Sequence, residues 1–156
     1  MGEIKTIAIG CDHGGYDRKQ EVMAYLTGKG YAVTDFGCFS KDSMDYPDVA
    51  FPTAEAVAAG KFDRGIVICT TGIGVSICAN KVKGIRCALV ADTFSAEMTR
   101  RHNDTNILAL SAHCTDYDTS IRIIDIWLDT AFEGGKPEGA RHLRRVEKIT
   151  AYENQH

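Results

Sequence analysis

The segment GIVICTTGIGVS, residues 65–76, places a thiol directly before a turn that contains glycines. The apolar run 64–69 predicts a buried strand that ends at Cys69. The turn then consists of Thr70, Thr71, Gly72, Ile73 and Gly74. A cysteine here would lie at the amino end of the next helix, where backbone N–H groups and the helix dipole favour a thiolate. The pattern marks Cys69 as a candidate base or nucleophile, although a strand cysteine also packs as a small apolar side chain.

Four kinds of chemistry place a cysteine or glycines at such a turn. Gly72 and Gly74 begin the dinucleotide pattern G-x-G-x-x-G, but Ile77 occupies the third glycine position. A phosphatase-type loop needs an arginine six residues after the cysteine, and Val75 stands there. Two interpretations remain. The cysteine is either a phosphocysteine carrier or a general base that takes a proton from carbon while the loop N–H groups hold an oxyanion.

Two pairs of residues that each contain a histidine lie near the ends of other predicted elements. Asp12 and His13 follow the first strand, and His102 and Asn103 end the helix before the fifth strand. Either pair alone is more often a turn or a helix cap. Ligands of parallel sheets bind beyond the carboxyl ends of the strands, so we expect both pairs to gather with the thiol at that edge.

The segment RHLRRVEKI, residues 141–149, predicts a helix with a basic face. Arg141 and Arg145 are four residues apart and share that face, whereas Leu143, Val146 and Ile149 form an apolar stripe on the other side. Two guanidinium groups at this spacing can bind one phosphate. A carrier needs neither these arginines nor the histidines, so the set favours an enzyme with a general base over a phosphocysteine carrier.

Short apolar runs alternate with segments of helical periodicity along the chain. The predicted strands are residues 5–10, 31–37, 64–69, 86–91 and 106–111. The predicted helices are residues 16–30, 48–60, 74–84, 93–104, 119–135 and 140–154. The strands are rich in Val, Ile, Leu and Ala and mostly lack alternation, as in a parallel sheet covered on both faces. We therefore predict one doubly wound α/β domain over residues 1–156.

Composition narrows the class of protein. The chain has 156 residues, of which 44% are hydrophobic and 25% charged, as in an ordinary globular domain. A net charge of −3 argues against a nucleic-acid partner. The sequence lacks an apolar run of roughly 20 residues and a signal-peptide pattern, so we expect no membrane association and a cytoplasmic location. Six scattered cysteines without a CxxC or HExxH pattern predict neither a disulfide framework nor a metal or other cofactor.

Five motifs in order resemble the family of ribose-5-phosphate isomerase B and galactose-6-phosphate isomerase. They are IAIGCDHGG, DYPDVA, ICTTGIGVSICANKVKGIRCALVADTFSA, RRHNDTNILAL and FEGG followed by RHLRRVEKI. The resemblance covers about residues 5–150. It implies a Rossmann-like three-layer α/β/α sandwich and metal-free aldose–ketose isomerisation of a sugar phosphate. It also implies a homodimer, with a tetramer as the alternative, whose active sites lie at the subunit interface.

The resemblance also implies roles for individual residues. Cys69 matches the base that moves a proton between C1 and C2 through a cis-enediolate. Thr71 and the amides of residues 70–74 match the groups that hold the enediolate oxygens. His102 matches the residue that opens the furanose ring by protonating its oxygen. Substrate contacts are implied for Asp12, His13, Tyr46, Asn103, Arg141 and Arg145. The two arginines in this set match a phosphate clamp.

Three features depart from the family pattern. Thr70 stands where the family usually has glycine, and His113 stands where an arginine commonly contacts the anion. The segment KPEGA, residues 136–140, is an insertion before the arginine helix. We expect these changes to alter substrate choice or affinity more than reaction type. Ribose 5-phosphate and ribulose 5-phosphate are the expected substrates, with allose 6-phosphate and galactose 6-phosphate as alternatives. A sugar-phosphate binding protein without turnover is the other alternative, but the presence of Cys69, His102 and Arg145 favours the enzyme.

Overall fold

The five apolar runs form one parallel sheet in the computed structural model, which describes residues 4–156. Residues 1–3 of the predicted domain lie outside the described residues. The strands are β1 Thr6–Cys11, β2 Ala32–Asp35, β3 Arg64–Cys69, β4 Cys87–Leu89 and β5 Ile107–Ser111. Their order is β2-β1-β3-β5-β4, and every neighbouring pair is parallel. The predicted five-stranded parallel sheet is thereby confirmed.

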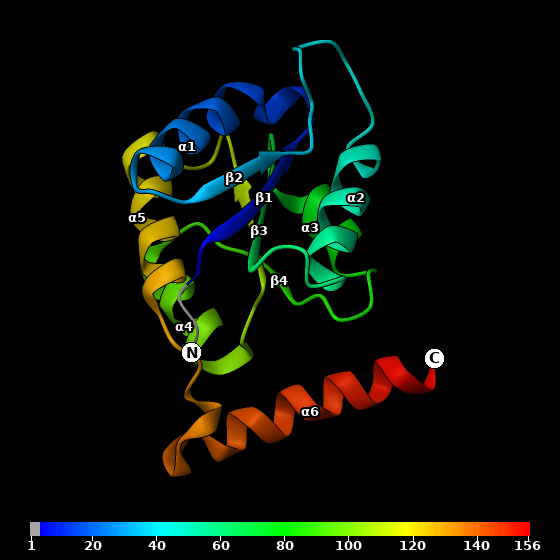
Figure 1. Ribbon diagram of the computed structural model, residues 1–156, viewed down its shortest axis with the longest axis vertical. Coiled ribbons are helices and arrows are strands. Elements are labelled where there is room, and N and C mark those ends of the chain that lie inside the picture. The colour runs from blue at the N-terminus through cyan, green and yellow to red at the C-terminus, as the bar shows by residue number, and fades with distance from the viewer. Residues whose placement is uncertain (1–3) are drawn as a thin grey trace.

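Helices cover both faces of this sheet. They are α1 Tyr16–Gly28, α2 Pro47–Ala58, α3 Ile73–Ala79, α4 Thr93–Asn103, α5 Tyr117–Asp129 and α6 Ala140–Gln155. Three short 3₁₀ helices are η1 His13–Gly15, η2 Glu133–Gly135 and η3 Pro137–Gly139. Figure 1 shows α1, α4 and α5 on one side of the strands and α2 and α3 on the other. The chain thus forms the predicted three-layer α/β/α sandwich.

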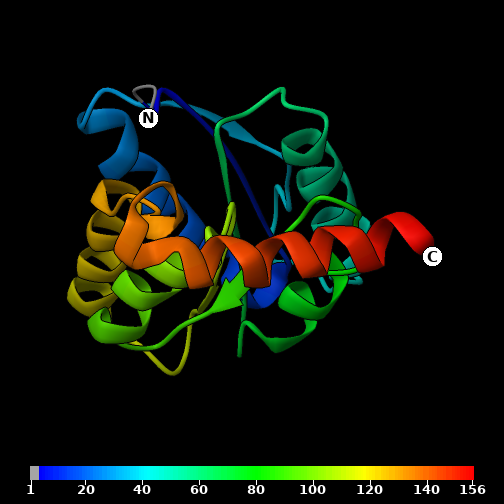
Figure 2. The same cartoon turned by 90° about the horizontal axis from the view of Figure 1, so that it is seen from below.

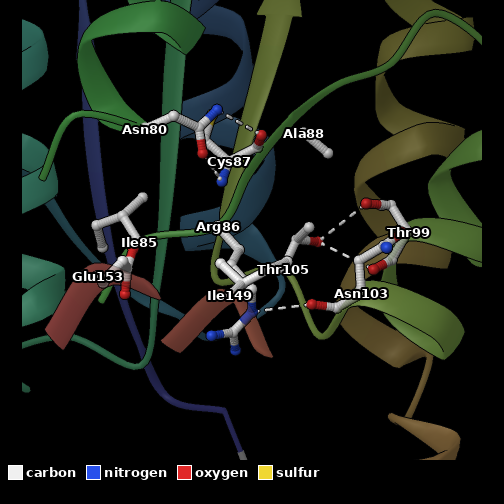
Figure 3. Close-up of a pocket in the computed structure, with 10 residues that line it drawn as sticks. All are labelled: Asn80, Ile85, Arg86, Cys87, Ala88, Thr99, Asn103, Thr105, Ile149 and Glu153. Carbon is white, nitrogen blue, oxygen red and sulfur yellow. Dashed lines mark hydrogen bonds between the residues drawn. The ribbon is translucent and has the colours of Figure 1, made fainter. Parts of the chain in front are cut away.

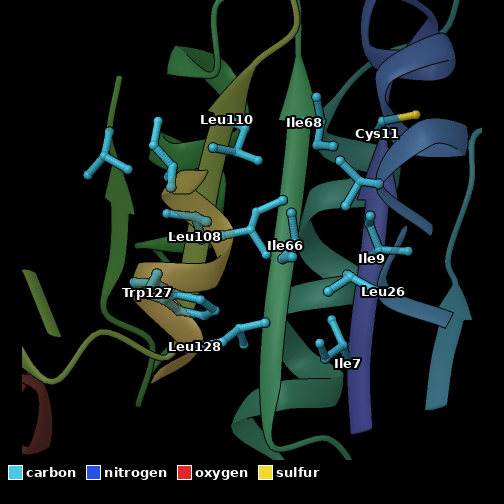
Figure 4. Close-up of a cluster of buried hydrophobic side chains, with 14 of the residues drawn as sticks. Ile7, Ile9, Cys11, Leu26, Ile66, Ile68, Leu108, Leu110, Trp127 and Leu128 are labelled. Atoms are coloured by element: carbon cyan, nitrogen blue, oxygen red, sulfur yellow. The ribbon is translucent and has the colours of Figure 1, made fainter. Parts of the chain in front are cut away.

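Alternating strand residues supply the two apolar cores. Ile66 and Ile68 of β3 face the larger core, which they share with α1 and α5 around Trp127 (Figure 4). Val67 and Cys69 face the opposite core, against the small side chains of α2 and α3. Because the side chains of a strand alternate between faces, Cys69 is fixed on the side of the sheet that α3 covers.

Two helices, α3 and α5, end at least five residues earlier than the sequence predicts, whereas the other helix ends agree with the prediction within two residues. α3 ends at Ala79 instead of reaching Gly84, because the Asn80 side chain donates to the carbonyls of Ser76 (3.1 Å) and Cys87 (2.9 Å) and ties the chain to β4. α5 ends at Asp129 instead of residue 135, because Thr130 has an extended backbone conformation. Side-chain caps of this kind compete with helix continuation and are not visible in apolar periodicity.

The last helix lies below the strands in Figure 1, and in the view from below it crosses in front of them (Figure 2). α6 packs mainly against η2 and α4 through its first turns. Val146 is buried there, but Leu143 and Ile149 of the predicted apolar stripe are 39% and 45% exposed. One chain therefore leaves much of this stripe uncovered. Within residues 4–156, none of the helices has the length and apolar character needed to cross a membrane.

Candidate active site

The thiol of Cys69 lies at the carboxyl end of the central strand, directly beneath the glycine turn. Its side chain is buried, with 5% exposed, and the Gly72 N–H donates to its Sγ atom at 3.0 Å. Gly72 has φ of +75° and precedes the first turn of α3. A positive φ without a side chain lets the backbone turn back over the sulfur. This donor stabilises negative charge on the sulfur, as a base or nucleophile requires.

We expect Gly72→Ala to destabilise the protein more than Gly84→Ala. Both glycines have positive φ, which costs alanine about 1–2 kcal/mol. A Cβ at residue 84 meets no other atom within 4 Å, whereas one at residue 72 would lie 3.0 Å from the Leu110 backbone and collide with Leu89. Overpacking adds about 1–3 kcal/mol. Urea unfolding of both variants measures the difference; equal losses would show that the turn is not tightly packed.

Three further predicted site residues lie at the same edge of the sheet. β1 pairs with β3, so Asp12 and His13 follow a strand that ends beside Cys69. Asp12 Oδ1 accepts from the Gly15 N–H at 3.2 Å, and His13 Nδ1 accepts from the Met44 N–H at 3.3 Å. The Tyr46 ring packs against Gly74, because a Cβ there would lie 2.7–2.9 Å from it. These hydrogen bonds and contacts place Asp12, His13 and Tyr46 around the turn.

The two substituted positions are joined to each other. The Thr70 carbonyl accepts from the His113 N–H at 3.1 Å and from the Ser111 hydroxyl at 2.7 Å. The Thr70 hydroxyl occupies the space beside Gly14, where a Cβ would collide with it. The added threonine side chain is thus accommodated by a glycine in the neighbouring loop. Thr70 and His113 both lie at the edge of the sheet that carries the thiol.

His102 and Asn103 lie at the other edge, so the expectation that they gather with the thiol in one chain is wrong. α4 begins after β4 and runs back to the start of β5, as a right-handed crossover requires. The end of α4 therefore lies at the amino ends of the strands. The register pairs Cys69 with Ser111, at the far end of β5. From Ile107 to Ser111 the strand alone spans roughly 13 Å.

The arginine pair belongs to this second group. α6 contacts α4 and η2, and Arg141 donates to the Glu138 carbonyl at 2.9 Å. The inserted segment folds as η3, in which Gly139 lies too close to the Glu133 carbonyl for a side chain. The insertion thus forms a compact turn that delivers Arg141 and Arg145 on the exposed side of α6. The predicted site residues of one chain thus form two groups, one at each edge of its sheet, which we call the two candidate half-sites.

A pocket of about 340 Å³ lies beside the second half-site. It is open to solvent between β4, α4 and α6, and Figure 3 shows Asn103 at its rim with its backbone carbonyl accepting from Arg86 at 2.9 Å. Ile149 and Glu153 of α6 close the opposite side. Neither the thiol nor the glycine turn lines it. The pocket is therefore separate from the Cys69 half-site.

Comparisons with known proteins show the family of this chain. A model of the family described as Ribose/Galactose Isomerase matches residues 7–149. Ribose-5-phosphate isomerase B of Escherichia coli is 45% identical over 150 residues, which cover 96% of this chain and 97% of that protein. The structure of Clostridium thermocellum ribose-5-phosphate isomerase B has a TM-score of 0.91 at 49% identity, covering 96% of this chain and 98% of that one. The chain belongs to the ribose/galactose isomerase family.

A third relative carries a ligand. The structure of ribose-5-phosphate isomerase B from Mycoplasma genitalium with bound ribulose 5-phosphate has a TM-score of 0.90 and 40% identity, and the match covers 97% of each chain. The family and fold that the five motifs predict are confirmed. The roles of the individual residues in this family member remain predictions.

Two residues of the second half-site escaped sequence reasoning. His142, between the two clamp arginines, is buried with 3% exposed, and its ring stacks on His102 with centroids 4.1 Å apart and planes 6° apart. Glu133 of η2 lies beside both rings and accepts from Arg101 at 2.6 Å. In the sequence both appear as ordinary polar residues near a basic helix, because no periodicity reports which histidine a helix turns inward.

Among residues 4–156, the one His/Cys/Asp/Glu cluster compact enough for a metal ion is His102, Glu133 and His142, whose ligand atoms lie within 4.8 Å of one another. Its geometry does not suit an ion. An imidazole binds a metal in its ring plane, and two parallel stacked rings do not direct their nitrogens at one point. Glu133 is already neutralised by Arg101. We therefore assign no metal ion to this cluster.

Acidification should destabilise the wild type more than a His142→Phe variant. Burial lowers the pKa of His142 below its ordinary value of 6.5, and the charges of His102, Arg141 and Arg145 lower it further. The unfolded chain therefore binds a proton that the folded chain excludes, so stability falls as the pH drops below about 6.5. Melting temperatures at pH 7.5 and 5.5 measure the effect. Equal losses in both proteins would contradict it.

Proposed function

We propose that this isomerase interconverts ribose 5-phosphate and ribulose 5-phosphate. One support is the Cys69 thiol, which accepts from the Gly72 N–H beneath the turn. A second is the group of His102, Arg141 and Arg145 at the other edge of the sheet. The third is the set of relatives that are named for this reaction. His102 protonates the furanose oxygen as the bond from C1 to that oxygen breaks, and the C1 hydroxyl releases its proton to solvent as it becomes the carbonyl. The product is the open-chain aldehyde that the next step requires.

The isomerisation itself is a proton transfer between adjacent carbons. The Cys69 thiolate takes the proton from C2, and the electron pair moves to the carbonyl oxygen to form a cis-enediolate. The N–H groups of the turn and the Thr71 hydroxyl stabilise that oxygen charge. The thiol then returns the proton to C1 while the hydroxyl proton on the C2 oxygen passes to the C1 oxygen, so C1 carries a hydroxyl and the carbonyl now stands at C2. Atoms balance without any added reactant.

We propose further that two copies of the chain build each site. Cys69 and His102 act on neighbouring substrate atoms, each within about 3 Å, so they must lie within about 8 Å of each other. Within one chain they lie at opposite edges of the sheet. The exposed apolar residues of α6 supply a surface that a second copy would cover. In a homodimer of this kind, α6 of one chain brings its arginines to the partner's thiol.

Arg141 and Arg145 are expected to bind the phosphate in that arrangement. A charge-assisted hydrogen bond contributes about 1.5–3 kcal/mol, so Arg145→Ala should raise KM by roughly 10- to 100-fold. The phosphate lies far from the reacting carbons, but its binding energy positions them, so kcat also falls. Arg144→Ala, on the same helix outside the predicted clamp, is the matched control. Equal kinetics of the two variants would remove the clamp from the proposal.

The deciding experiment for the substrate is a ketose-formation assay on purified protein. Ribose 5-phosphate, allose 6-phosphate and galactose 6-phosphate are offered separately. We expect ribose 5-phosphate to give the highest kcat/KM. A preference for a hexose phosphate would overturn the proposed substrate but keep the reaction class, whereas no turnover of any sugar by folded protein would overturn the reaction as well.

A further inference from the structure

The contact between His102 and His142 joins the helices α4 and α6, which are separated in the sequence by β5 and α5. His102 ends α4, and His142 lies in the first turn of α6. The rings overlap face to face, with centroids 4.1 Å apart and an angle of 6° between planes. A flat ring in van der Waals contact restricts rotation of its neighbour about the last side-chain bond. His142 thus fixes the plane in which the His102 nitrogens point.

His142 makes this contact at a cost to its own hydrogen bonding. The His142 side chain is buried, with only 3% exposed. Within the described part of the chain, neither of its ring nitrogens has a hydrogen-bond partner. An unsatisfied buried polar group is destabilising. The His142 ring is nevertheless buried in contact with His102, so it presents a fixed flat surface to that imidazole.

The surrounding charges favour a neutral ring at this place. Burial first, and then the charges of His102, Arg141 and Arg145, lower the pKa of His142, whereas Glu133 acts in the opposite direction. Glu133 forms an ion pair with Arg101 of α4, and this positive charge weakens the effect of the Glu133 carboxylate on the pKa of His142. Two stacked imidazoles with a proton each would repel one another at 4.1 Å. A neutral His142 avoids this repulsion.

We propose that His142 is a positioning residue for ring opening: its buried ring is the flat surface that holds the His102 imidazole in the orientation needed to protonate the furanose oxygen. The inference rests on the proposed role of His102. It assigns His142 no contact with the substrate and no proton transfer of its own. The ring matters, and its nitrogens do not.

The test separates ring opening from proton transfer between carbons. Ribose 5-phosphate is a furanose, but ribulose 5-phosphate has its C5 oxygen blocked by phosphate and remains open-chain. Both directions are followed at rising enzyme concentration. If a variant cannot open the ring, the forward rate levels off at the spontaneous opening rate of the sugar. The reverse rate starts from an open chain and keeps rising in proportion to enzyme.

We expect His142→Ala to show this difference, with catalysed ring opening reduced by roughly 10²-fold because the acid is misplaced. His142→Phe, which keeps a flat ring without nitrogens, should restore the forward rate to within about tenfold of wild type. Proton NMR adds a readout that does not depend on turnover: the upfield ring-current shift of the His102 ring protons should vanish in His142→Ala and persist in His142→Phe. Melting temperatures check that both variants fold.

Each contrary result has a distinct meaning. If His142→Phe is as slow as His142→Ala while the ring-current shift persists, the nitrogens are needed and the positioning role is wrong. If His142→Ala slows both directions equally, the residue supports α6 and not ring opening. His102→Asn is measured alongside. If it keeps the proportional forward rate, the proposed ring-opening role of His102 fails, and the inference for His142 fails with it.

Discussion

Replacing Cys69 by alanine should lower the turnover of ribose 5-phosphate by roughly 10²–10⁴-fold, the usual contribution of a general acid or base. Both directions should slow together, because the thiol acts on the step between open-chain aldose and ketose, which both directions share. The variant also removes the acceptor of the Gly72 N–H, but the packing of Tyr46 against Gly74 remains, so the turn should keep its conformation. Initial rates with ribose 5-phosphate and with ribulose 5-phosphate measure the effect.

Cys78→Ala is the matched control for this variant. Cys78 belongs to the same apolar core, is 7% exposed, and has its pKa raised by burial and by the charge of Cys69. Losing it removes a buried thiol of the same size, at a cost in stability of about 1 kcal/mol, while the turn and Cys69 remain. Its rates should stay within about twofold of wild type. Activity that survives Cys69→Ala, or falls equally in both variants, would reject Cys69 as the base.

Much of the fold follows from the apolar runs. The strand 64–69 is predicted at the bounds it has in the structure, because continuous apolar residues between turns leave little choice in a sheet covered on both faces. The helix ends at Asn80 and Thr130 were missed, because they depend on a side-chain cap and a backbone bend that do not change hydrophobic periodicity.

Of the candidate site, only the residues that directly follow a strand could be placed from the sequence. Residues that directly follow a strand, such as Asp12 and Thr70, were placed correctly by the rule for carboxyl ends. His102 was placed at the wrong edge because a helix that precedes a parallel strand must end at the amino side of the sheet. That geometry was implicit in the order of the elements. The inward turn of His142, in contrast, depends on how α6 packs against α4 and has no sequence signal.

Because the two half-sites lie at opposite edges of one chain, we expect a dimer of two different inactive variants to regain activity. The Cys69→Ala and His102→Asn variants should each be nearly inactive toward ribose 5-phosphate at high enzyme concentration. In a dimer with one chain of each kind, one site combines the intact thiol of one chain with the intact imidazole of the other. The second site lacks both groups. If sites are built by two copies, that dimer should have about half of the wild-type activity.

The mixed dimer is obtained by co-expressing the two variants with different affinity tags and purifying over both. A dimer of two Cys69→Ala chains carrying the same two tags is the control for purification. If each site lay within one chain, every site in the mixed dimer would lack one group, and the dimer would be as inactive as its parents. An inactive mixed dimer would also require Cys69 and His102 of one chain to lie within about 8 Å of each other. In the parallel register of β3 and β5 these residues lie at opposite edges of the sheet, so the sheet itself would have to rearrange. Activity in the mixed dimer therefore tests the composite site and the direction of α4 together.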